Sequence, residues 1–122
     1  MADGFKILAQ ASLGTSFGTV YTVPTASGSK FASRESSQAI ISSIVVCCMA
    51  GTGTPWYSIR VVKSGETGGD EETVIYQKGL AIKDTDVLSL GIGLVSGDFI
   101  EAVRSNLTND KITMNIFGTE IL

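Results

Sequence analysis

The sequence predicts a single all-β domain, an antiparallel β-sandwich of the jelly-roll or Greek-key kind with about eight strands. Two observations predict this fold. Short runs rich in Val, Ile, Thr and aromatic residues are separated by clusters of Gly, Ser, Thr, Asn and Asp, a rhythm typical of antiparallel sandwiches and barrels. Within several runs apolar and polar residues alternate, as in a strand that buries one face. The chain has 122 residues, enough for one domain with its own core.

The first two strand candidates are short. Lys6–Ala11 and Thr19–Val23 are each followed by a cluster of turn-forming residues. Residues 1–18 contain several Gly and Ser, so we expect them to form an N-terminal arm or an edge strand. Residues 19–122 are then expected to form the sandwich itself.

The third run, Ala39–Cys48, fits two patterns. Its apolar residues match a helical stripe, but their β-branched side chains lose rotamer freedom in a helix and therefore favour a strand. Such a strand is apolar on both faces. We expect it at the centre of a sheet, or with its second face against another chain.

Tyr57–Lys63, Val87–Leu94 and Lys111–Phe117 alternate more clearly, and Phe99–Arg104 does so less cleanly. Tyr57, Ile59 and Val61, for example, fall on one face of their run. These runs predict the other strands, and no segment predicts a helix with comparable strength. The expected strands are Trp56–Lys63, Thr73–Gln77, Leu80–Lys83 continuing into Val87–Leu94, Phe99–Arg104 and Lys111–Leu122.

Composition argues against most enzymes. The formal net charge of −3 disfavours a general nucleic-acid binder. The chain has no histidine, which removes His-based acid–base catalysis, Ser-His and Cys-His nucleophiles and most zinc sites. No apolar run approaches the roughly 20 residues of a membrane helix, and no signal-peptide pattern is present at the start. We expect a structural or binding protein, with no catalytic residue, cofactor, metal, nucleic-acid partner or membrane partner.

The two cysteines, Cys47 and Cys48, are adjacent. Neighbouring side chains on a strand point to opposite faces, so we expect no ordinary disulfide between them. The favoured interpretation is two small apolar residues in a core strand, made in a reducing cytosol. A reactive or intermolecular thiol is the alternative.

Three segments resemble binding motifs but have simpler interpretations. Gly91–Gly97 lacks the spacing of a phosphate loop and predicts a strand whose glycines allow close backbone approach, followed by a turn. Asp70–Glu72 offers oxygen ligands for calcium, although a solvated loop tip is favoured. Asp84–Asp86 is expected to be a turn with local side-chain hydrogen bonds rather than a pair of catalytic carboxylates.

From Tyr21 onward, several short motifs follow one another in a recognisable order and spacing. They are Tyr21-Thr22-Val23-Pro24, Ser42-Ser43-Ile44-Val45-Val46-Cys47, Tyr57-Ser58-Ile59-Arg60-Val61-Val62, Leu80-Ala81-Ile82, Asp84-Thr85-Asp86, Gly91-Ile92-Gly93-Leu94, Ser96-Gly97-Asp98 and Ile112-Thr113-Met114-Asn115-Ile116-Phe117-Gly118-Thr119-Glu120-Ile121. This order resembles a group of small virion structural proteins of tailed bacteriophages, frequent in cyanobacterial phages. The chain departs from that group's pattern at Cys48 and at residues 24–28, which affects local turns.

The resemblance implies a bacteriophage virion structural protein, assembled in the bacterial host cytoplasm. The role it favours is a capsid decoration (cement) protein that binds and stabilises the major capsid shell. A tail or baseplate component with host-receptor binding is the alternative. A carbohydrate-binding module, a third hypothesis, is supported by one Trp alone. The expected partners are the major capsid protein or other virion proteins, and further copies of the chain, for instance in a trimer.

Position and apolar character single out candidate interface residues in three places. They lie in the N-terminal arm, after Pro55 and in the last run. For the last run, ordinary core strand is the favoured interpretation. The candidates are Phe5, Ile7, Leu8, Trp56, Phe117 and Ile121.

Overall fold

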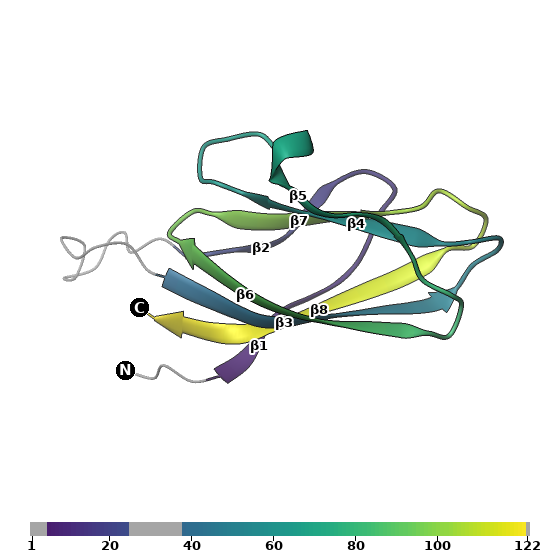
Figure 1. The fold of residues 1–122 in the computed structure, drawn as a ribbon, viewed down its shortest axis with the longest axis horizontal. Helices are drawn as coiled ribbons and strands as arrows, with labels where there is room; N and C mark the ends of the chain where they lie inside the picture. The colour runs from purple at the N-terminus through teal and green to yellow at the C-terminus, as the bar shows by residue number, and fades with distance from the viewer. Residues whose placement is uncertain (1–4, 25–37, 122) are drawn as a thin grey trace.

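The computed structural model describes residues 5–24 and 38–121, which form two four-stranded antiparallel sheets packed face to face (Figure 1). A single-turn 3-10 helix, η1 (Asp70–Glu72), is the sole helical element of these residues. None of them forms a helix long and apolar enough to cross a membrane. The strands are β1 (Phe5–Ser12), β2 (Gly18–Thr22), β3 (Gln38–Ala50), β4 (Trp56–Val62), β5 (Thr73–Gly79), β6 (Thr85–Val95), β7 (Phe99–Arg104) and β8 (Lys111–Ile121).

The strand order is that of a jelly roll. One sheet has the order β1-β8-β3-β6 and the other the order β2-β7-β4-β5, and every neighbouring pair is antiparallel. Successive strands therefore cross repeatedly from one sheet to the other, as in the eight-stranded double Greek key. The predicted fold class is confirmed.

The strands begin and end close to their predicted bounds, with one clear error. Leu80–Lys83, predicted as a strand, forms a turn before β6. The N–H of Asp84, the next residue, donates to the carbonyl of Ala81. Lys83 has φ of 67°, a conformation that ends an extended strand. The apolar Leu80 is nevertheless buried, which explains why the segment looked like a strand in the sequence.

The ambiguous third run is a strand, as predicted. β3 pairs with β8 on one side and β6 on the other, so its two edges are satisfied within the sheet. A register shift between Ile41 and Ser43 places Ser42 and Ser43 together between the inward-facing Ile41 and Ile44. The two β-branched residues on either side thus both reach the core.

The core lies between the inner faces of the two sheets. Its members alternate along the strands with outward-facing residues, as the sequence predicted for β4, β6, β7 and β8. The fully buried large side chains come from both sheets and include Tyr57, Ile41, Ile44, Ile59, Ile100, Ile112, Met114 and Ile116.

At one side of the sandwich, a Tyr–carboxylate–Lys cluster joins the sheets. The Tyr21 hydroxyl of β2 donates to Glu120 Oε2 of β8 at 2.5 Å, and Lys6 Nζ of β1 lies 2.9 Å from Glu120 Oε1. Desolvation acts to raise the pKa of Glu120, but the hydrogen bonds from Tyr21 and Lys6 lower it below its ordinary value. Burial, then the bond to Glu120, raises the pKa of Tyr21.

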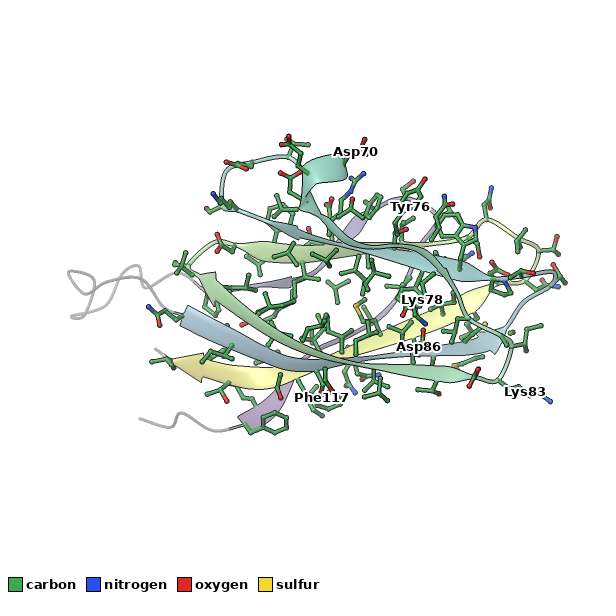
Figure 2. The ribbon with its side chains drawn as sticks, in the orientation of Figure 1. Asp70, Tyr76, Lys78, Lys83, Asp86 and Phe117 are labelled. Atoms are coloured by element: carbon green, nitrogen blue, oxygen red, sulfur yellow. The ribbon has the colours of Figure 1, made fainter. Side chains whose placement is uncertain are left out.

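The opposite side repeats this arrangement with different strands. The Tyr57 hydroxyl of β4 and the Lys78 ammonium of β5 each donate to Asp86 Oδ2 of β6 at 2.8 Å. Figure 2 shows Lys78 and Asp86 facing each other between the two sheets. Desolvation again acts to raise the pKa of Asp86, and the bonds from Lys78 and Tyr57 lower it overall.

Candidate interaction surface

The outer face of the sheet β1-β8-β3-β6, here called the open face, is almost without charge. Its four strands contain four charged residues, Lys6, Asp86, Lys111 and Glu120. Lys6, Asp86 and Glu120 belong to the clusters between the sheets, so Lys111, at the beginning of β8, is the one remaining on these strands. Depletion of charge is the compositional mark of the centre of a protein–protein interface.

Large apolar side chains are exposed on the open face. Phe5 and Ile7 of β1 are 64% and 53% exposed, Ile40 of β3 49%, and Val87 and Val95 of β6 65% and 47%. Isolated exposed apolar residues are ordinary, but several on one uncharged sheet face mark a surface that another molecule covers.

Four of the six predicted interface residues lie on this face. Phe5 and Ile7 of β1 stand beside Phe117 and Ile121 of β8, because Phe5 pairs with Thr119 and Ile7 with Phe117. Figure 2 shows Phe117 on the side of its sheet that faces away from the other sheet. The structure thus gathers residues more than a hundred positions apart in sequence.

The other two predicted residues lie elsewhere. Leu8 occupies the register shift between Ile7 and Ala9 and packs against the core. Trp56 begins β4 in the other sheet and is half-buried, with its backbone tied to Ser105. The structure does not bring Trp56 together with the open face.

The six predicted interface residues include none from β3 or β6, although the second face of Ala39–Cys48 was expected either within the sheet or against another chain. Ile40, Val87 and Val95 are exposed on the open face, and the paired alternation of β3 and β6 was the signal that could have found them. Of the two cysteines, Cys48 lies in the core and burial raises its pKa, whereas Cys47 is partly exposed on the open face. Both are free thiols on opposite faces of the central strand β3, as predicted from their adjacent positions.

The outer face of the sheet β2-β7-β4-β5, here called the covered face, differs sharply. Ser58, Val62 and Val103 point away from the core, yet each is less than 8% exposed. Arg60 Nη1 lies 3.4 Å from Glu101 Oε2, and its guanidinium lies 3.7 Å from the centre of the Phe17 ring. Other parts of the same chain therefore cover β4 and β7 on this face, whereas Val74 and Tyr76 of β5 are 49% and 73% exposed.

The acidic segments have structural roles. Glu72 Oε1 accepts the Gly69 N–H at 2.7 Å, and Asp84 Oδ1 accepts the Thr85 N–H at 2.9 Å. Asp86 belongs to β6 rather than to the predicted turn, and its lowered pKa is the opposite of what a catalytic acid needs. The described residues contain no group of three or more side chains placed to hold a metal ion.

Comparison with solved structures agrees with the jelly roll. A chain in the acidic stable capsid structure of the Helicobacter pylori bacteriophage KHP30 has a TM-score of 0.59 and 12% identity, over 99% of this chain and 96% of that chain. The two chains therefore share one fold from end to end. A chain of the infectious bursal disease virus Gx strain has a TM-score of 0.49 and 14% identity, over 98% of this chain and 29% of that one. No protein-family model and no curated protein matches the sequence.

Proposed function

We propose that this protein is a bacteriophage virion structural protein, specifically a capsid decoration (cement) protein that binds the major capsid shell. The observation that carries the proposal is the end-to-end fold likeness to a chain of a bacteriophage capsid structure. The order of the sequence motifs, which resembles small virion proteins of tailed phages, supports the same role. A fold alone hosts many functions, so the open face matters as a second support.

The proposed activity consists of binding, not of chemistry. A protein that binds assembled capsid subunits stabilises the shell by mass action. Many copies on one particle, or several copies joined to each other, add avidity without a strong single contact. The nearly uncharged open face, with its exposed Phe5, Ile7 and Ile40, supplies a surface suited to joining such copies to each other.

The copy number of the chain in purified particles tests this proposal. Quantitative mass spectrometry would compare it with the major capsid protein. A number of copies comparable to the capsid protein is the expected result. A number many-fold lower would contradict decoration and favour the tail or baseplate, and absence from the particle would contradict any virion role.

A second experiment tests the stabilising role itself. Particles made without the protein are expected to lose shell integrity at a lower temperature than complete particles, as followed by release of packaged DNA. Adding the purified protein back should restore the higher temperature. Equal stability with and without it would contradict the cement function while leaving a virion location intact.

A further inference from the structure

Side chains on the open face form rows that run across its four strands. The strand register fixes which residues stand at the same level. In two neighbouring rows the side chain on β1 is large and the residue on β6 is small. The first row is Phe5, Thr119, Ile40 and Gly93, and the second is Ile7, Phe117, Ser43 and Ser89.

These rows create a ridge and a hollow on the same surface. The ridge consists of Phe5, Ile7 and Phe117, of which Phe5 and Ile7 are more than half exposed. The hollow consists of Ser43, Ser89, Gly91 and Gly93, which have small side chains or none and leave the sheet backbone uncovered.

Gly91 lies at the register shift between β3 and β6, where a bulge accounts for a glycine, whereas Gly93 pairs in register with Ile40 and has no such explanation within the chain. A Cβ added at Gly91 or Gly93 would meet nothing within 4 Å, and neither residue has a positive φ. Glycine weakens a strand interior, so it often marks a bulge, a tight bend or a place where a ligand or another backbone approaches closely. At Gly93 the ladder is in register and nothing in the described chain makes that approach, which points to a second molecule.

Charge also distinguishes the open face from the rest of the molecule. The chain carries a formal net charge of −3, which opposes contact between copies. The open face carries no acidic side chain among its described residues, whereas η1 (Asp70–Glu72) lies on the outer side of the other sheet (Figure 1). Two open faces can therefore meet without bringing acidic side chains together, and Lys111, their one charged residue, lies at the end of the face where β8 begins.

We propose that the open face is a homotypic interface, in which the ridge of one copy fills the hollow of a second copy. The two-fold axis runs parallel to the strands, between the two stacked sheets and above the space between β8 and β3. It places each row of one copy over the same row of the second copy, in the opposite strand order. It sets Phe5 over Gly93 of the second copy, and Ile7 over Ser89 and Gly91 of the second copy. Every contact occurs twice, as in an isologous dimer. Stacked sheets keep their strand directions within about 30° of each other, which preserves this matching of rows.

The size of the face suits a stable dimer. Four strands spaced about 4.8 Å apart, with about 3.4 Å of rise for each residue of the 11-residue β8, span roughly 19 by 35 Å. The two faces of a dimer would together cover a rectangular area of roughly 1,300 Å², before the extra area of the side chains is counted. Stable interfaces bury about 1,200–2,000 Å² in total.

Sedimentation equilibrium of the purified full chain over a concentration series tests the proposal. The wild type is expected to reach the mass of two chains. Gly93→Glu should raise the dimer dissociation constant by about 30-fold or more, because its carboxylate would be buried against the second copy without a partner. Its matched control is Gly18→Glu, since Gly18 is also an exposed strand glycine with nothing within 4 Å of an added Cβ, but lies on β2 of the other sheet. This control should dimerise like the wild type.

A size exchange tests the ridge and hollow directly. Gly93→Phe alone should abolish dimers, and combining it with Phe5→Gly should restore them, because each large side chain would again face a small one. Far-UV circular dichroism and thermal melting would verify that every variant folds.

A monomeric wild type, a trimer, equal effects of the two glutamate variants, or failure of the size exchange to restore dimers would each overturn the proposal. None of these results would alter the copy number in particles, so the interface and the proposed function can fail separately.

Discussion

The two outer faces of the sandwich differ in how far their outward-facing apolar residues are covered by the chain itself. Over β4 and β7 of the covered face, the chain buries its own outward-facing residues, such as Val62 at 1% exposure, and places Arg60 between Glu101 and Phe17. On the open face, equally apolar residues such as Val87 stay 65% exposed. The difference teaches that alternation along a strand does not predict whether the outer face of its sheet is covered by the same chain or left exposed. What decides it is whether another segment of the same chain returns to cover the strands.

Two matched valines provide the strongest test of this contrast. Val62→Ala should lower the free energy of unfolding by about 2–3 kcal/mol, because it removes fully buried methyl groups and leaves a cavity. Val87→Ala in dilute solution should change it by less than about 0.5 kcal/mol. Urea denaturation of both variants measures the difference. Similar losses would mean that the two faces are equally covered in the isolated chain.

A pair of glycines sharpens the comparison between strands of one sheet. An added Cβ at Gly118 of β8 would collide with the backbone oxygen of Ile40 and crowd Leu8, so Gly118→Ala should cost about 1–3 kcal/mol. Gly91→Ala meets open space and should be neutral or stabilising by up to about 0.5 kcal/mol in the monomer. Thermal and urea unfolding distinguish the two. A destabilising Gly91→Ala would show that this glycine serves the monomer's own fold.

The clusters that join the sheets predict a smaller, pH-dependent effect. Asp86 and Glu120 have lowered pKa values in the folded chain, so their contribution to stability is present above the unfolded pKa values of about 4. It is lost as the pH falls through the folded values. Unfolding at a series of pH values should show stability declining below about pH 4. Tyr21 and Tyr57, whose pKa values are raised, predict the reverse loss above about pH 10.

Amide variants provide the control for that profile. Asp86→Asn and Glu120→Gln should each cost about 1 kcal/mol at neutral pH and make the acid limb shallower. An unchanged acid limb would show that other carboxylates govern acid unfolding.

Most of the strands could be predicted, because alternation and turn residues are local signals. Phe99–Arg104 was predicted with its observed bounds, and β3 was distinguished from a helix by its branched side chains. Leu80–Lys83 was mistaken for a strand because a buried Leu80 gives the same apolar signal whether it lies in a strand or a turn.

The candidate surface was only partly predictable. Phe5, Ile7, Phe117 and Ile121 were identified from apolar character, but their meeting on one face depends on the pairing of β1 with β8, which local patterns do not contain. For the same reason Trp56 was grouped with residues of the other sheet. The hollow at Gly91 and Gly93 was read as a close backbone approach, and the described chain provides none.

The position of β8 also affects when the chain can fold. β8 is synthesised after the other seven described strands, yet it lies between β1 and β3 and pairs with both. Until β8 emerges from the ribosome, the edges of β1 and β3 that pair with it have unpaired backbone groups. The pairing of Phe5 with Thr119 also closes nearly the whole described chain into a loop, which has an entropic cost. Such non-local pairing makes folding slow and leaves strand edges open to wrong partners. A truncation that removes β8 should therefore abolish the entire β1-β8-β3-β6 sheet and not only its last strand.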